Sequence, residues 1–247
     1  MVGVVGSVDT DTDISRGDTD DITDTGSKLR GAGVIPPLLA TNRLRLRPCS
    51  PNDLPMLYAM ATSDELFWRW RFGGTIPTYD TFCQSFSVGV LTQFTVCSLS
   101  SNDPIGLVVA YSPDIPNGTC YIAAMMQPNM LRTGMGIEAM YLFIMYIFKT
   151  WDLYKLYLEV LEFNIDQFAS GIDRYFHQEA CYKKHHYYDG KRWDQYVYGL
   201  YRDEFLSHPT VVRYGTHIAN IANLTSKGTN GVHNTKIANT QVFNFIA

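Results

Sequence analysis

Residues 129–140 read NMLRTGMGIEAM and place Gly134 and Gly136 between an apolar run ending near Met126 and a second, longer apolar segment. A glycine-rich turn that leads into a helix directs free backbone N–H groups and the positive end of the helix dipole to one point, where anions bind. The stretch therefore predicts a phosphate-type anion site, and a purely structural turn is the alternative.

The chain on both sides of the glycines alternates between strand and helix signals. Residues 42–47 alternate leucine and arginine, which is typical of a half-buried strand, and Ser50-Pro51 begins a helix. Short turns join the next three strands, so these form an antiparallel meander. The predicted strands are 42–47, 91–99, 104–111, 119–126, 154–163, 182–187 and 195–202, and the predicted helices begin at Ser50 and span 78–88, 134–150 and 165–176. This order predicts an α+β fold with a central mixed sheet of about seven strands and helices on both faces.

The two ends of the chain differ in composition from its middle. Residues 1–33 carry seven aspartates and almost no aromatic residues, which predicts a disordered acidic leader over 1–35. Residues 207–247 lack a steady period and are expected to be a flexible or loosely docked tail. One folded domain, residues 36–206, is predicted between them. The remaining 17 acidic and 17 basic residues of 34–247 give no charge pattern for nucleic acid or an anionic membrane.

The five cysteines are odd in number and form no C-x-x-C pair, which indicates reduced thiols in a cytoplasmic protein and no metal site. The longest uncharged apolar run is far shorter than the ~20 residues that span a bilayer. No basic, apolar secretory signal is found at the N-terminus. We therefore expect a protein without a membrane partner, as a monomer or a homodimer.

A dinucleotide site is one interpretation of the glycines. Gly134-x-Gly136-x-x-Ala139 fits a relaxed dinucleotide fingerprint, and Glu159 lies where a ribose-binding acid is expected. In that fold, however, a strand runs directly into the first glycine, whereas here about six loop residues intervene and the preceding strands are antiparallel. A nicotinamide-dependent oxidoreductase is therefore the weaker alternative.

The longer loop suits the pyrophosphate of coenzyme A, because several successive backbone N–H groups can surround it. The chain resembles the GNAT acyl-CoA transferases, and in particular the branch with the ribosomal-protein-alanine N-acetyltransferases. The similar segments, in the family's order, are Thr41-Asn-Arg-Leu-Arg-Leu-Arg-Pro48, Asp103-Pro-Ile-Gly-Leu-Val108, Arg132-Thr-Gly-Met-Gly-Ile-Glu-Ala139, Leu158-Glu-Val160 with Asn164, Tyr187-Tyr-Asp-Gly-Lys-Arg-Trp-Asp194 and Leu200-Tyr-Arg-Asp-Glu-Phe205.

The resemblance implies that the fourth and fifth strands splay apart and hold the pantetheine arm of acetyl-CoA, or another acyl-CoA, between them. Backbone groups near Met125 and Met126 would pair with that arm, although both methionines equally suit the core. Asn164 would bind the arm as well. The loop that would hold the pyrophosphate comprises Leu131, Arg132, Thr133, Gly134, Met135 and Gly136.

The catalytic acid and base are less evident in this chain. Relatives carry a tyrosine seven residues after the asparagine or a serine three residues after it, where this chain has Gly171 and Gln167. Tyr175 is the substitute acid candidate, with a packing role as its alternative. Glu159 is the first candidate for the base that removes a proton from an alkylammonium.

The acceptor site is expected in the aromatic segment after the first helix. Trp68, Trp70 and Arg71 could form an aromatic slot with cationic edges, suited to an aromatic, carboxylate-bearing or peptide acceptor, or the tryptophans could close the core. The sequence thus predicts an acyl-CoA-dependent N-acyltransferase that acetylates a primary amine of a small molecule or a peptide N-terminus. A non-catalytic acyl-CoA-binding module and a structural protein are the alternatives.

Overall fold

The computed structural model describes residues 39–68, 72–168, 171–172, 174–213 and 215. The predicted acidic leader and most of the predicted C-terminal tail lie outside these residues, as do Trp70 and Arg71. The predicted domain boundaries at 36 and 206 stay predictions.

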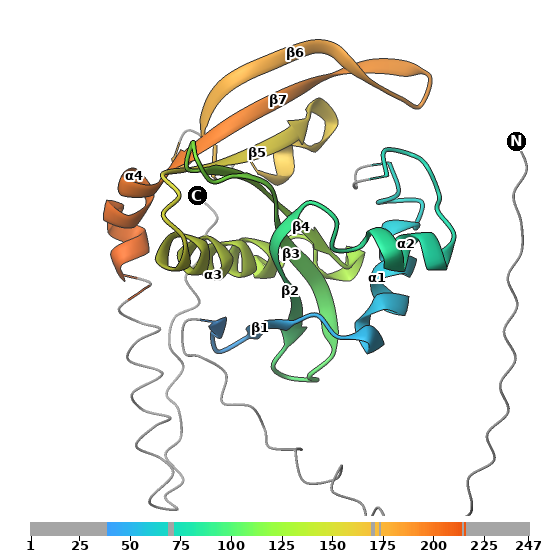
Figure 1. The fold of residues 1–247 in the computed structure, drawn as a ribbon, viewed down its shortest axis with the longest axis horizontal. Coiled ribbons are helices and arrows are strands. Elements are labelled where there is room, and N and C mark those ends of the chain that lie inside the picture. Colours follow the sequence, from blue (N-terminus) through green and yellow to red (C-terminus); the bar gives the residue numbers. More distant parts are fainter. Residues whose placement is uncertain (1–38, 69–71, 169–170, 173, 214, 216–247) are drawn as a thin grey trace, which may run out of the picture. The chain divides into compact units, whose positions relative to one another are not determined.

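Seven strands form one mixed sheet with the order β1-β2-β3-β4-β5-β7-β6 (Figure 1). Only β4 and β5 pair in parallel, and every other neighbouring pair is antiparallel. This confirms the predicted seven-stranded mixed sheet. The strands are β1 (Leu44–Pro48), β2 (Val90–Ser98), β3 (Pro104–Asp114), β4 (Thr119–Met126), β5 (Lys155–Leu161), β6 (His177–Tyr188) and β7 (Lys191–Tyr201).

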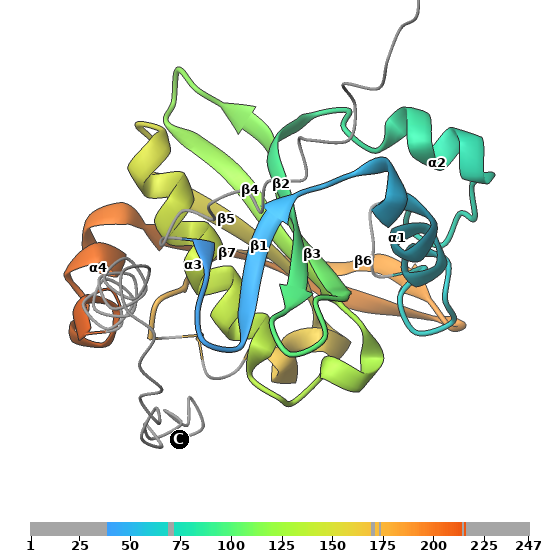
Figure 2. The same ribbon diagram turned by 90° about the horizontal axis from the view of Figure 1, so that it is seen from below.

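Helices cover both faces of the sheet. The α-helices are α1 (Leu54–Ala61), α2 (Tyr79–Ser85), α3 (Met135–Thr150) and α4 (Arg202–Ser207), and the 3-10 helices are η2 (Pro51–Asp53), η3 (Pro128–Met130) and η4 (Glu162–Gln167). The apolar helix α3 packs on one face with the main core, as its sequence predicts. Helices α1 and α2 lie on the other face (Figure 2). They pack there against Leu107 and Met125.

The strand β1 shows how the sequence pattern sets the faces of the sheet. Leu44 and Leu46 are fully buried against α3, whereas the arginines between and beside them are only partly covered. Successive side chains of a strand point to opposite faces, so the leucine and arginine alternation places one set in the core and the other outside it.

The parallel strands β4 and β5 separate after three residue pairs. Their ladder joins Thr119 to Lys155, Cys120 to Leu156 and Tyr121 to Tyr157, and it ends there. Beyond it, among the strands of the described residues, β4 pairs only with β3 and β5 pairs only with β7. The five residues from Ile122 to Met126 therefore leave an edge of about 16 Å, at ~3.3 Å per residue, without a strand partner. The predicted splay of the fourth and fifth strands is confirmed.

The predicted helix over 165–176 is wrong for the residues that the structure describes there. The 3-10 helix η4 ends at Gln167 and turns follow, in which the N–H groups of Gly171 and Ile172 donate to the Phe168 carbonyl. Ile165, Phe168 and Ile172 still pack on Leu158 and Val160. Their helical spacing thus reflects a packed face, but glycine at 171 weakens a continuous helix.

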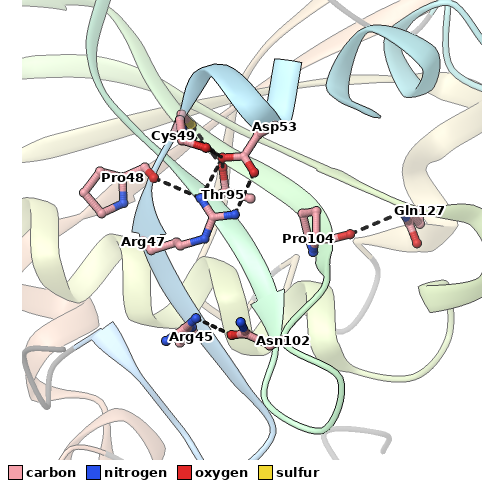
Figure 3. A network of polar contacts seen from close by, with 10 residues as sticks. Arg45, Arg47, Pro48, Cys49, Asp53, Thr95, Asn102, Pro104 and Gln127 are labelled. Atoms are coloured by element: carbon pink, nitrogen blue, oxygen red, sulfur yellow. Dashed lines mark hydrogen bonds and ion pairs between the residues drawn. The ribbon is translucent and has the colours of Figure 1, made fainter. Parts of the chain in front are cut away.

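The carboxylate of Asp53 ties α1 to the sheet (Figure 3). Arg47 donates two hydrogen bonds of 2.6 Å to its two oxygens, and the Ser50 N–H and Thr95 hydroxyl donate at 2.8 and 3.0 Å. Burial alone would raise the pKa of Asp53, but the hydrogen bonds from Arg47, Ser50 and Thr95 outweigh it and lower the pKa to about 2. Strands β1 and β2 and the start of α1 thereby share one ionic centre.

We expect the substitution Asp53→Asn to lower the free energy of unfolding by about 3 kcal/mol, because it leaves the Arg47 cation without its carboxylate in a site where Asp53 is only 2% exposed. Urea unfolding monitored by circular dichroism measures this. Asp152→Asn is the matched control, because Asp152 pairs with Arg202 at 3.1 Å but is fully exposed. Equal stability losses in the two variants would contradict the role of Asp53.

The same carboxylate predicts a pH dependence of stability. Because the pKa of Asp53 is about 2 in the folded chain and 3.8 ordinarily, its ion pair contributes fully above about pH 4. This contribution is lost as the pH falls from about 4 through about 2, where the carboxylate takes up a proton. Urea unfolding at a series of pH values should show this decline in the natural protein. A decline of the same size in Asp53→Asn would refute the assignment to Asp53.

Candidate active site

The loop between β4 and α3 offers free backbone donors. Arg132 and Gly134 both have positive φ, 62° and 77°, and the intervening Thr133 does not, which produces an alternating, concave backbone. The N–H groups of Leu131, Thr133 and Met135 hydrogen-bond within the loop. Those of Arg132, Gly134 and Gly136 have no partner among the described residues. These three donors, next to the α3 N-terminus, fit a pyrophosphate.

An ion pair supports this loop from the residue that precedes β1. Arg43 donates from Nε to Glu138 Oε2 at 2.7 Å, contacts the same oxygen through Nη2, and donates from Nη1 to the Thr133 carbonyl at 3.1 Å. Glu138 is nearly buried in the first turn of α3, where its charge would repel a phosphate. Arg43 neutralises that charge and holds the loop backbone. Sequence reasoning missed this pair because 95 residues separate its members.

The end of β4 presents its backbone to the open gap. Met125 and Met126 are both buried, on the α1–α2 face and the α3 face respectively, so their side chains belong to the core. Gly106 pairs with Met126 across β3 and β4, and a Cβ there would lie 2.5 Å from the Met125 carbonyl oxygen and 2.6 Å from Met126 Sδ. Gly136 approaches from α3, with Met126 Cγ 3.3 Å from a Cβ built there. Two glycines thus allow the close packing beside this edge.

The two side chains predicted after β5 have different contacts. Asn164 is half-buried in η4, just past β5, and accepts a hydrogen bond of 3.3 Å from Gln167. Tyr175 packs edge-on against Phe205 and His208, at ring distances of 5.9 and 4.7 Å. It lines a cavity of about 330 Å³ together with α4 and the residues after it. The structure therefore places Tyr175 among packing contacts, the alternative role that its sequence allows.

Glu159 lies on β5 beside the gap and on the face that α1 and α2 cover. It is exposed, two residues beyond Tyr157, the last residue of the β4–β5 ladder. Partial burial raises the pKa of its carboxyl, while a hydrogen bond from Gln195 and the nearby His185 oppose that rise. A carboxyl with a raised pKa beside the gap suits proton transfer. The structure thus brings Glu159 and the loop to the two ends of the same opening.

Trp68 is part of an aromatic cluster and does not form an open slot. Its ring stacks on Tyr188 at 3.6 Å and meets Phe163 edge-on at 4.4 Å, and it is 6% exposed. Phe163 in turn meets Trp193 at 4.9 Å. The residues after α1 thereby contact η4 and the β6–β7 hairpin. Trp70 and Arg71 lie outside the described residues.

The acetyltransferase (GNAT) domain family matches residues 43–169, just over half of the chain. Solved structures with the same fold include spermidine N-acetyltransferase from Vibrio cholerae in complex with CoA and spermine, at TM-score 0.59 and 16% identity over 68% of this chain and 100% of that one. A chimera of the Vibrio cholerae enzyme SpeG and hSSAT aligns at TM-score 0.57 and 16% identity, covering 66% of this chain and 98% of that one. No curated protein sequence matches the chain.

The chain therefore belongs to the GNAT acetyltransferase family, and its class is that of an acetyltransferase. The narrower ribosomal-protein-alanine branch is not shown by these matches. The dinucleotide alternative does not fit a sheet in which β4 and β5 are the sole parallel pair. Within the residues described, no helix is long and apolar enough to cross a membrane, and no three His, Cys, Asp or Glu side chains gather as metal ligands.

We expect Gly106→Ala to lower the free energy of unfolding by about 1–3 kcal/mol, because the new methyl group overlaps the Met125 backbone, which cannot move without disturbing the sheet. Urea unfolding measures this change. Gly171→Ala is the control, since a Cβ there meets the Phe176 ring at an ordinary 3.4 Å. If both alanine variants lose the same free energy of unfolding, β3 and β4 are not packed as closely at Gly106 as described.

Proposed function

We propose that this acetyltransferase moves an acetyl group from acetyl-CoA directly to a primary amine while both substrates are bound. The observation that carries the proposal is the parting of β4 and β5 after Tyr121 and Tyr157, beside a loop in which three N–H groups have no partner among the described residues. An extended arm with amide groups can pair with the free strand edges, and a diphosphate can accept from the loop donors.

The residues have separate roles in this proposal. The N–H groups of Arg132, Gly134 and Gly136 bind the pyrophosphate, and Arg43 offsets the Glu138 charge beside it. The backbone of Met125 and Met126 aligns the pantetheine arm, and Asn164 lies past the end of β5 to bind it. The pyrophosphate thus occupies the wide end of the gap and the thioester lies toward its apex at Tyr121.

The transfer itself needs one bond made and one broken. The amine nitrogen attacks the thioester carbonyl carbon and forms the amide, while the carbon–sulfur bond breaks and CoA leaves as a thiolate. Glu159 accepts the proton that the amine loses, either directly or through water, and the thiolate takes up a proton. Because Tyr175 packs on Phe205 and His208, we assign the proton that the thiolate takes up to solvent water.

A narrower form of the proposal concerns the acceptor. The sequence resembles the ribosomal-protein-alanine branch, for which a peptide N-terminus would be the acceptor, and a small-molecule amine is the other possibility. The spermidine N-acetyltransferase with the same fold was solved with spermine, an amine. Both acceptors are primary amines, and the similarities support that class of acceptor. A cytoplasmic location and a monomeric or homodimeric state stay predictions from the sequence.

Mass spectrometry of the full chain with acetyl-CoA and a mixed library of amines and peptides tests the function. We expect at least one library member to gain one acetyl group in step with release of free CoA. Binding of CoA without any acetylated product would favour the non-catalytic acyl-CoA-binding module. Absence of a CoA-dependent thermal shift would defeat the proposal and favour a structural protein.

Gly134→Ala should weaken CoA binding by about tenfold or more, because φ is 77° at Gly134 and alanine will shift this loop toward negative φ. Isothermal titration calorimetry with CoA measures the change. Gly190→Ala is the matched control: its φ of 74° imposes the same backbone strain, but at the tip of the β6–β7 hairpin. Unaltered affinity in Gly134→Ala would show that the loop does not hold the diphosphate.

A further inference from the structure

Three tyrosines form a row on the face of the sheet opposite α3. Tyr111 of β3, Tyr121 of β4 and Tyr157 of β5 are direct register partners. Their ring centroids are 5.6 and 5.2 Å apart, with neighbouring planes tilted by 32° and 31°. All three side chains are partly exposed. The row ends at the apex of the gap between β4 and β5, where the proposed function places the thioester.

Glu159 extends this row by one carboxylate. It lies two residues beyond Tyr157 on the same face, and across the gap the corresponding position of β4 is the small residue Ala123. Burial raises the pKa of Tyr121, and the charges of Glu159, Tyr157 and Tyr182 raise it further. The effect of Glu159 agrees with its place near the Tyr121 ring. Ring faces and a carboxylate therefore border the same space.

Glu159 differs from three other carboxylates, each of which pairs with a basic side chain. Asp53 pairs with Arg47, Glu138 with Arg43 and Glu179 with Lys155. Within the described part of the chain, Glu159 forms no salt bridge, and the groups that lower its pKa are the amide of Gln195, through a hydrogen bond, and the charge of His185. A carboxylate that lies beside aromatic rings and forms no salt bridge is suited to bind a cationic ligand.

One ring of the row already contacts an ammonium group of the protein itself. Lys155 Nζ lies 4.6 Å from the centre of the Tyr157 ring, and 5.7 and 5.3 Å from those of Tyr154 and Tyr201. Its charge is balanced by Glu179 at 3.0 Å. The negative ring faces attract cations, and on the other side of Tyr157 along β5 Glu159 offers the carboxylate that an external ammonium would need.

We propose that Tyr111, Tyr121, Tyr157 and Glu159 form the acceptor site of this transferase and select an amine that bears a net positive charge and no carboxylate beside the nitrogen. This inference rests on the proposed function, because it takes the gap at Tyr121 to hold the thioester. This preference for a positively charged acceptor is the opposite of the one expected from the Trp68–Arg71 segment, where cationic edges would favour a carboxylate-bearing acceptor. A simple arylalkylamine, an alkyl polyamine or a peptide N-terminus has the required chemistry, whereas a free amino acid does not.

Three ligands of similar shape isolate the charge that the site recognises. Titration calorimetry with saturating CoA, which cannot transfer an acetyl group, measures binding of 2-phenylethylamine, phenylalanine and 2-phenylethanol. We expect the amine to bind about tenfold or more tightly than either the amino acid or the alcohol. Compared with 2-phenylethylamine, phenylalanine adds only a carboxylate, and 2-phenylethanol lacks only the positively charged amine.

Two variants assign the preference to the row. Glu159→Gln removes the charge of an exposed side chain, and it should reduce the preference for the amine over the alcohol about fivefold or more. Tyr121→Leu should weaken amine binding about fivefold. Tyr187→Leu is the matched control, since Tyr187 is 64% exposed on β6 away from the row, and we expect it to bind all three ligands as the natural protein does.

The outcomes separate this inference from the function on which it rests. CoA binding without preference for the amine, or with tighter binding of phenylalanine, would overturn the cationic acceptor site and leave the acetyltransferase intact. A preference that persists unchanged in Glu159→Gln would also overturn it. Failure of CoA itself to bind would overturn the proposed function, and the acceptor site with it.

Discussion

The structure depends on a sheet that is left open in its middle. Strands β4 and β5 pair over three residues and then part, so backbone hydrogen-bonding groups inside the fold face a gap and not a neighbouring strand. Unpaired edges are normally hidden or blocked, because they attract other strands. Keeping this edge open requires that both strands be held from their outer sides, by β3 for β4 and by β7 for β5. The gap is therefore a property of the whole sheet.

Charged groups stabilise the two regions that border the gap. Arg47 and Asp53 hold the start of α1 against β1 and β2, and Arg43 and Glu138 hold the loop before α3 against β1. Arg47 lies in β1, and Arg43 directly precedes that strand. An arginine fork can bridge a carboxylate and a backbone carbonyl together, as Arg43 does, and a lysine has no such planar geometry. The β5 side of the gap differs, because Glu159 forms no salt bridge with any described residue.

Aromatic contacts connect the two halves of the sheet across the opening. Trp68 follows α1, yet its ring stacks on Tyr188 of the β6–β7 hairpin and meets Phe163 beyond β5. The tyrosine row crosses from β3 to β5 at the apex (Figure 1 shows these strands). Packed rings resist displacement because each buries a large apolar area with few rotatable bonds. Substrates would thus meet a preformed wall at the apex, with the loop donors at the other end.

Local patterns in the sequence determined the strands, most helices and the loop. The alternation of Leu44 and Leu46 with arginines, the apolar run of α3 and the spacing of Gly134 and Gly136 each act over a few residues, where backbone geometry and hydrophobic periodicity suffice. The predicted helix over 165–176 failed because its apolar spacing satisfies packing on Leu158 and Val160 without a helix. Tertiary structure alone decided that Arg43 meets Glu138, that Tyr111, Tyr121 and Tyr157 share a row, and that Tyr175 packs against Phe205. Those contacts depend on strand order and register. Both arise from the burial of the whole chain, so no short segment of the sequence predicts them.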